Sequence, residues 1–114
     1  MQRWIKRFYR SKENIKKEEM QEMLSKYSNV ILLDVRSHQE YAEGHLNGAI
    51  NIPTYDLYTD ASKVLKDKET IIIAYCTVGV RSENAIKILK KMGYKNLYHL
   101  DGGIGWVKFF KKQL

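Results

Sequence analysis

Cysteine and proline are nearly absent from this 114-residue chain, which contains one of each, Cys76 and Pro53. A single cysteine makes an intramolecular disulfide impossible, which excludes the disulfide framework of small secreted domains and fits a reducing compartment. The sequence also shows no internal repeat, no low-complexity tract and no apolar run of the kind that a signal peptide or a membrane span needs. We therefore expect a cytoplasmic protein.

Length and composition fit one globular domain. With 114 residues, of which 44% are hydrophobic, the chain can bury one core and leaves no room for a second domain. Possible metal ligands are not grouped, because the three histidines (His38, His45 and His99) are scattered and Cys76 has no thiol partner. We expect neither a metal site nor a cofactor.

The formal net charge of +7 would suit nucleic acid, a membrane surface or an anionic small substrate. Most of the excess lies at the two ends of the chain, where lysine and arginine are more often solvated than engaged in binding. These residues are Arg3, Lys6, Arg7, Arg10 and Lys12 at the start and Lys108, Lys111 and Lys112 at the end. Tyr55, Tyr58 and Tyr75 would suit stacking on a single strand, but no RNA-module motif accompanies them, so we expect no nucleic acid partner.

The start of the chain forms a separate basic segment. We divide the sequence into a basic N-terminal extension, residues 1–14, and a domain, residues 15–114. Trp4, Ile5 and Phe8 lie among the charges of the extension and would form one turn of an amphipathic helix that touches a membrane. We favour the simpler interpretation, in which this segment is a helical arm that packs on the domain.

Apolar runs alternate with helical patterns along the domain. Short β-branched runs predict strands over residues 30–33, 49–52, 71–75 and 96–100, and helical spacing predicts helices over 15–27, 57–65, from about 81 to 92, and over 104–110. Strands that alternate with helices predict an α/β fold with a parallel sheet covered on both faces. Ligands bind such sheets at the carboxyl ends of the strands, and Cys76 directly follows the strongest predicted strand.

The segment from Cys76 to Ser82 carries the clearest chemical signal. Backbone N–H groups in a turn between a strand and a helix can converge on one point, and the helix N-terminus adds partial positive charge. Arg81 adds a planar fork suited to an oxyanion, and Gly79 allows a positive φ. A cysteine after a buried strand is often only a core residue. The glycine, the arginine and the helix start together favour a reactive thiolate instead.

Three separated segments of the chain resemble the rhodanese family. The segment Cys76–Arg81 is similar to the rhodanese active-site loop, in which a glycine follows the cysteine three places on and an arginine two places beyond. The segments 33–36 with 40–53 (LDVR and EYAEGHLNGAINIP) and 100–106 (LDGGIGW) are similar to the family's N-terminal and C-terminal signatures. The resemblance covers residues 15–110 in family order. It implies a three-layer fold, with a central, mostly parallel sheet of about five strands flanked by helices on both faces.

The resemblance also implies sulfurtransferase activity. Cys76 would attack the outer sulfur of a small anionic donor (thiosulfate, polysulfide or a persulfide), become a persulfide, and pass the sulfur to a thiol, cyanide or a protein acceptor. The loop residues Thr77, Val78, Gly79, Val80 and Arg81 would hold the persulfide and the donor. Residues expected to support the site are Asp34, Arg36, His45, Ser82, Gly102 and Gly103. We interpret Asp34 and Arg36 as an ion pair, His45 as a brace for its loop, and His38 and His99 as surface or satisfied residues.

Two other functions remain open. Cysteine-dependent phosphatases and arsenate reductases place one more residue between cysteine and arginine than this chain does, and we find no general acid for a leaving group. Rhodanese-like modules that only bind proteins usually lose the nucleophile, whereas this chain keeps Cys76. Many rhodaneses that favour thiosulfate have a basic residue directly after the cysteine. Because this chain has Thr77 there, we expect a weak affinity for thiosulfate.

Overall fold

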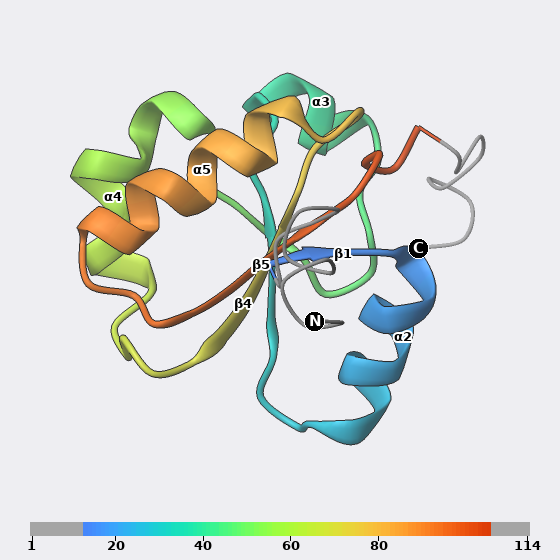
Figure 1. Ribbon diagram of the computed structural model, residues 1–114. Helices are drawn as coiled ribbons and strands as arrows, with labels where there is room; N and C mark the ends of the chain where they lie inside the picture. The colour runs from blue at the N-terminus through green and yellow to red at the C-terminus, as the bar shows by residue number, and fades with distance from the viewer. Residues whose placement is uncertain (1–12, 106–114) are drawn as a thin grey trace, which may run out of the picture.

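The computed structural model describes residues 13–105, which form a five-stranded sheet in the order β1-β5-β4-β2-β3 (Figure 1). The strands are β1 (Asn14–Ile15), β2 (Ile31–Asp34), β3 (Ile50–Asn51), β4 (Ile71–Tyr75) and β5 (Asn96–Leu100). Every pair of neighbouring strands is parallel. The predicted α/β fold with about five strands is therefore confirmed, and within the described residues the sheet is parallel throughout.

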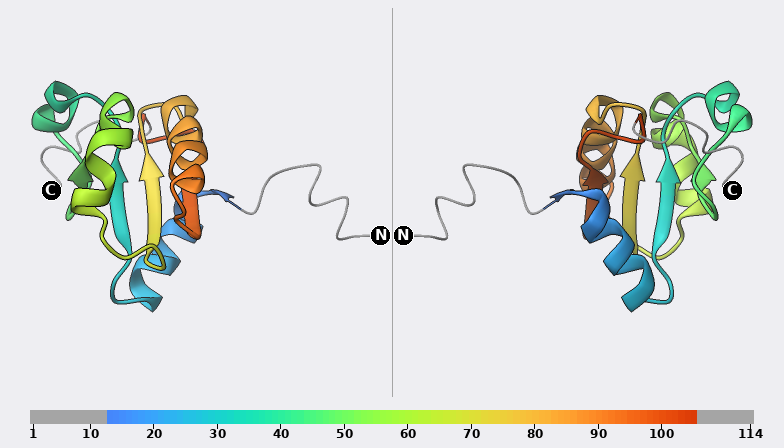
Figure 2. Two further views of the ribbon diagram at one scale, coloured as in Figure 1. Left: turned by 90° about the vertical axis from the view of Figure 1, so that its left-hand side faces the viewer. Right: turned by 90° about the vertical axis from the view of Figure 1, so that its right-hand side faces the viewer.

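Helices cover both faces of this sheet. They are α2 (Lys17–Lys26), α3 (His38–Glu43), α4 (Leu57–Val64) and α5 (Val80–Lys91), with a short 3-10 helix η1 (Thr54–Asp56) before α4. In Figure 1, α4 and α5 lie on one side of the sheet and α2 on the other, and Figure 2 looks onto each of these layers in turn. This is the three-layer arrangement that the sequence predicts. None of the helices described is long and apolar enough to span a bilayer.

The alternation of side chains along β4 divides the core in two. Ile72, Ala74 and Cys76 belong to the apolar cluster between the sheet and helices α4 and α5. Ile73 and Tyr75 belong to the cluster on the α2 side. Since successive residues of a strand point to opposite faces, the position of Cys76 after Tyr75 directs its side chain toward α5.

The predicted elements agree with the structure most closely around Cys76. The predicted strands 71–75 and 96–100 are confirmed without change, and the helix predicted to start near Arg81 begins at Val80. The helix ends at Lys91 with Met92 as its C-cap, and the φ of 99° at the following Gly93 is the left-handed conformation typical of a residue just past a helix.

The structure contains two short elements that the sequence did not predict, strand β1 and helix α3. The helix predicted from Ile15 begins at Lys17, because Ile15 instead pairs with Leu100 in the sheet and is buried. Helix α3 was not predicted, since its six residues are too few to show an apolar period. Its signal is the capping box of Ser37 and Glu40, in which each side chain bonds the other's backbone N–H.

The predicted segments at both ends fall largely outside the described residues. Residues 1–12 of the predicted extension, with its possible amphipathic turn, are among them, and so is most of the predicted helix 104–110. Within that last helix, Ile104 and Gly105 are described and form part of a turn. The division at residue 14 stays a prediction.

Candidate active site

Cys76 lies at the carboxyl end of β4, in the turn that leads into α5, and its side chain is fully buried. The backbone N–H of Gly79 points at the sulfur, with 3.0 Å between Gly79 N and Cys76 Sγ. A backbone donor at this position stabilises a negatively charged sulfur more than a neutral thiol. The turn therefore suits a thiolate or a persulfide.

Gly79 is required by the shape of this turn. Its φ is 100°, in the left-handed region, and a Cβ at this position would lie 3.2 Å from the backbone nitrogen of Gly102. Both observations favour glycine, because other L residues rarely adopt this φ and backbone cannot yield as a side chain can. The positive φ inferred from the sequence is confirmed.

Ser82 and His99 lie behind the sulfur. Ser82 Oγ is 3.8 Å from Cys76 Sγ, 3.1 Å from the Gly79 carbonyl oxygen and 3.3 Å from His99 Nδ1. Both Ser82 and His99 are buried. The sequence led us to treat His99 as a surface or satisfied residue, and only the register of β5 against β4 reveals that it reaches the cysteine through Ser82.

Arg81 is held by Glu40 of α3. Arg81 Nη1 and Nη2 donate to Glu40 Oε1 and Oε2 at 2.7 and 3.1 Å, a bidentate pair at the surface. The hydrogen bonds from Arg81 hold the pKa of Glu40 down, at about 2, and Glu40 raises the pKa of Arg81, with a smaller effect from Cys76. Sequence reasoning missed Glu40 as a site residue, although it begins the segment 40–53 that carries the family resemblance.

The Glu40–Arg81 pair leads to a prediction about how the stability of the domain depends on pH. Because the pKa of Glu40 is lowered in the folded protein, the stabilisation is present above its ordinary pKa of 4.5 and is lost as the pH falls toward about 2. Both side chains are partly exposed, so we expect less than about 1 kcal/mol. Urea unfolding at about pH 7 and about pH 3 should show a smaller acid destabilisation for Glu40→Gln than for the parent. Glu43→Gln, on the same helix, is the control and should behave like the parent; equal acid sensitivity of all three proteins would contradict this.

A second loop, residues 101–105, fixes the backbone of the turn that begins at Cys76 and leads into α5, which we call the active turn. Ile104 N donates to the Cys76 carbonyl oxygen and Gly105 N to that of Thr77, each at 2.9 Å. Gly103, with a φ of 68°, packs so closely that a Cβ there would lie 2.5 Å from the Cys76 carbonyl oxygen and nearer still to Thr77. Gly102 has a similar φ of 76° and open space around it. The loop holds two carbonyl oxygens of the turn, and the Gly79 N–H is directed at the sulfur.

Asp34 and Arg36 form a buried ion pair at the end of β2. Arg36 Nη2 lies 2.7 Å from Asp34 Oδ2 and also donates to the Gly44 carbonyl oxygen at 2.7 Å. Tyr75 lies under this pair, and burial raises the pKa of its hydroxyl well above the usual range, so the hydroxyl is neutral. The contacts tie the end of β2 to the loop after α3. They support a structural role for the pair.

His45 contacts its own loop. Its Nδ1 lies 2.8 Å from the Tyr41 carbonyl oxygen, and its ring stacks on that of Tyr41 with 3.7 Å between centroids and 8° between planes. These contacts fit the bracing role expected for His45.

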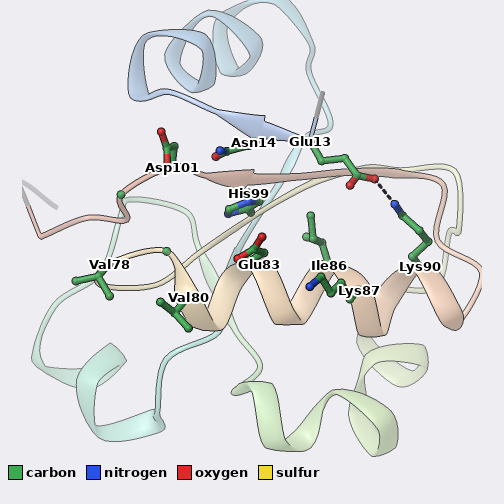
Figure 3. A pocket seen from close by; sticks show the side chains of 12 residues that line it. Glu13, Asn14, Val78, Val80, Glu83, Ile86, Lys87, Lys90, His99 and Asp101 are labelled. Carbon is green, nitrogen blue, oxygen red and sulfur yellow. Dashed lines mark ion pairs between the residues drawn. The ribbon is translucent and has the colours of Figure 1, made fainter. Parts of the chain in front are cut away.

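A cavity of about 480 Å³ lies beside the active turn, between α5 and strands β1 and β5 (Figure 3). Its walls include Val78, Gly79 and Val80 of the turn and the ring of His99. Neither Cys76 nor Ser82 lines the cavity, so of these three residues only His99 borders it. Across residues 13–105, no three histidine, cysteine or acidic side chains gather in a way that could hold a metal ion.

Comparison with known proteins agrees with this geometry. The model of the rhodanese-like domain family matches residues 16–108. The tRNA uridine(34) hydroxylase of Hamiltonella defensa is 39% identical over 105 residues, which cover 87% of this chain and 29% of that protein. The tRNA uridine(34) hydroxylase of Prochlorococcus marinus is 43% identical over 89 residues, covering 71% and 29%. The chain thus spans less than a third of the length of these curated relatives.

Solved structures show the same fold. The rhodanese-like domain of an Anabaena protein has a TM-score of 0.76 and 26% identity, covering 83% of this chain and 72% of that chain. A thiosulfate sulfurtransferase from Pseudomonas aeruginosa has a TM-score of 0.72 and 25% identity, covering 81% and 18%. Since the family model also matches most of the sequence, the chain belongs to the family of rhodanese-like domains.

Proposed function

We propose that this domain is a sulfurtransferase that carries sulfur as a persulfide on Cys76. The observation that supports this most directly is the position of the sulfur, which is buried at the end of β4 with the Gly79 N–H at 3.0 Å. The start of α5 lies directly behind it and Arg81 nearby. Backbone dipoles and a cation around one sulfur stabilise its anionic forms.

The reaction proceeds in two displacements. In the first, the Cys76 thiolate attacks the outer sulfur of the donor, a new S–S bond forms, and the donor's bond to that sulfur breaks with its electron pair leaving on the donor remnant, which is sulfite when thiosulfate is used. In the second, an acceptor thiolate or cyanide attacks the outer sulfur of the persulfide, and the electron pair returns to Cys76 Sγ. Two displacements replace one difficult transfer, and no external oxidant or reductant is needed.

Roles for the surrounding residues follow from their positions. The backbone N–H groups of Thr77, Val78, Gly79, Val80 and Arg81 would hold the persulfide and the donor's charge. Gly102 and Gly103 would support the turn from the second loop, together with the Asp34–Arg36 pair, His45 and Ser82. Val78 and Val80 are largely exposed at the turn and would contact the acceptor.

The turn's dimensions argue against phosphate chemistry. Four residues, Thr77 to Val80, separate Cys76 from Arg81. The Gly79 N–H already contacts Sγ, which favours one additional sulfur atom over a whole phosphate group. The pair with Glu40 also occupies Arg81 Nη1 and Nη2, which leaves fewer donors of the guanidinium for a phosphate.

The residue after the cysteine makes a prediction about the donor. Thr77 brings no positive charge to the turn, and Glu40 partly neutralises Arg81, so a dianionic donor gains little electrostatic attraction. We expect a KM for thiosulfate on the order of millimolar or higher, and a higher kcat/KM for polysulfide. Thr77→Lys should improve kcat/KM for thiosulfate several-fold, measured as thiocyanate formed from cyanide.

Thr77→Gln is the control for that experiment, because glutamine is nearly as long as lysine but carries no charge. It should leave the donor preference unchanged. A parent KM for thiosulfate well below about 1 mM, or an equal gain for both variants, would contradict the electrostatic explanation.

The curated relatives provide a second candidate, in which tRNA is the partner. Their names describe them as hydroxylases of uridine 34 in tRNA. The chain's net charge of +7 is compatible with binding to RNA. The sequence by itself led us to exclude nucleic acid. An electrophoretic shift of tRNA that weakens steeply with salt, as phosphate contacts require, would support this candidate and overturn the exclusion. For the sulfurtransferase function, we also propose that the protein is cytoplasmic and needs no cofactor.

A further inference from the structure

His99 is a buried histidine with a specific position relative to the cysteine. It lies on β5, next to β4, and only 7% of it is exposed. Its Nδ1 lies 3.3 Å from Ser82 Oγ, and Ser82 Oγ lies 3.8 Å from Cys76 Sγ. An imidazole is therefore connected to the sulfur through one hydroxyl group.

Ser82 can link these two groups because a hydroxyl both donates and accepts hydrogen bonds. In the structure the Cys76 thiol donates to Ser82 Oγ, and the Ser82 hydroxyl donates to the Gly79 carbonyl oxygen. Rotation of that hydroxyl about its C–O bond would let it donate to His99 Nδ1 instead, which lies 3.3 Å away. Cys76 and Ser82 are fully buried, so water does not compete for their contact, whereas His99 borders the cavity. The arrangement gives a thiol without solvent contact a route for its proton.

The other side of the His99 ring faces the cavity shown in Figure 3. Burial lowers the pKa of His99, so the ring is neutral near pH 7 and can accept a proton. Three carboxylates on three segments (Glu83 of α5, Asp101 after β5 and Glu13 before β1) act in the opposite direction and stabilise the imidazolium. Two lysines of α5, Lys87 and Lys90, also line the cavity, and Lys90 is paired with Glu13 at 2.6 Å.

We propose that His99 accepts the proton of Cys76 through Ser82 when sulfur is loaded and returns it when sulfur leaves. This rests on the proposed sulfurtransferase function. His99 acts through Ser82 and is a positioning residue; the bonds to sulfur are made and broken at Cys76.

Each half-reaction then balances. In loading, the thiol proton passes to Ser82 Oγ while the Ser82 proton passes to His99 Nδ1, and the resulting thiolate attacks the donor's outer sulfur. In unloading, the electron pair of the breaking S–S bond returns to Cys76 Sγ, and the same two proton shifts in reverse neutralise it. Protonating a buried leaving group as charge develops on it is the usual task of a general acid.

The test is the pH dependence of Cys76 alkylation by iodoacetamide, a neutral reagent that reacts with the thiolate and requires no sulfur donor. As the only cysteine in the chain, Cys76 gives an unambiguous signal. In the parent, the proton transfer from Cys76 to His99 is internal and its equilibrium does not depend on pH, so the rate should stay nearly constant as the pH falls from about 8 to about 6. His99→Asn should instead lose about tenfold per pH unit, because its thiolate forms only by loss of a proton to solvent.

Ser82→Ala provides an independent variant that breaks the same link without disturbing the cavity. It should give the same profile as His99→Asn, and the double variant should add nothing, since both remove one coupled unit. His38→Asn, at an exposed histidine, should match the parent. At strongly alkaline pH, where any cysteine thiol is ionised, all five proteins should react at rates within about twofold of one another.

Parallel profiles for the parent and His99→Asn, differing by a constant factor or not at all, would overturn the proposal and leave His99 a packing residue. The proposed function is judged separately, by whether sulfur is retained on Cys76. If the parent loads sulfur but the alkylation profiles are parallel, the sulfurtransferase function stands and the proton transfer to His99 is refuted. If the parent shows the pH-independent rate but never loads sulfur, the proton transfer stands and the sulfurtransferase function is refuted.

Discussion

Replacing Gly103 with alanine is expected to destabilise the domain by about 2–5 kcal/mol, because two penalties combine at this position. The φ of 68° disfavours any residue with a Cβ, and the Cβ would overlap the backbone of Cys76 and Thr77. The overlapping atoms are main-chain atoms of a turn already held by two hydrogen bonds, so they cannot move aside cheaply. A domain of this size is stable by only about 5–15 kcal/mol, so the loss should be large in urea unfolding.

Gly102→Ala is the matched control for this experiment. Gly102 is the preceding residue and has a similar φ of 76°, but a Cβ there would meet no atom within 4 Å. It should therefore suffer only the conformational penalty, about 1–2 kcal/mol. Equal destabilisation by the two variants would show that φ alone matters and that the second loop does not press on the active turn.

Cys76→Ser is expected to reduce thiocyanate formation from polysulfide and cyanide to background, a loss on the order of a thousandfold or more. Serine keeps nearly the same volume in the turn and can still accept the Gly79 N–H, so folding should be retained. It cannot form a persulfide, so both displacements fail together. Matching thermal unfolding of parent and variant would separate lost chemistry from lost structure.

The same variant distinguishes an enzyme from a binding module. If the domain only docks on a partner, Cys76→Ser should keep its biological activity, because the surface around the turn hardly changes. Residual turnover comparable to that of the parent would contradict the role of Cys76 as sulfur carrier.

The sequence predicts the part of the fold in which local pattern and packing agree. The run 71–75 is apolar and β-branched, and it forms the central strand β4 with the predicted bounds. Alternation of strands with helices was enough to predict a parallel sheet and to place Cys76 at the carboxyl end of a strand.

Elements that depend on distant partners were not predictable in the same way. β1 has only two residues, and it is a strand because Ile15 pairs with Leu100, more than eighty residues away. Helix α3 has too few residues for an apolar period, so only its capping box marks it. For β1, pairing with a distant strand decides the structure and local propensity does not. For α3, the helix is too short for its sequence pattern to be detected.

The site shows the same limit. Cys76, Gly79 and Arg81 stand together in one segment, so their spacing points to a turn around a sulfur. Glu40 and His99 come from α3 and β5, and their contacts with Arg81 and Ser82 depend on how those elements pack. A sequence pattern gives no distance between such residues, which is why their contributions emerge only from the structure.

The central claim, that Cys76 carries sulfur, is tested most directly by the intact mass of the protein after mixing with polysulfide or thiosulfate, alongside Cys76→Ser. The account predicts that the parent gains one sulfur atom, loses it again on addition of cyanide or a thiol, and gains more readily from polysulfide, while the variant gains none. A parent that retains no sulfur from either donor, or a variant that retains as much as the parent, would contradict it.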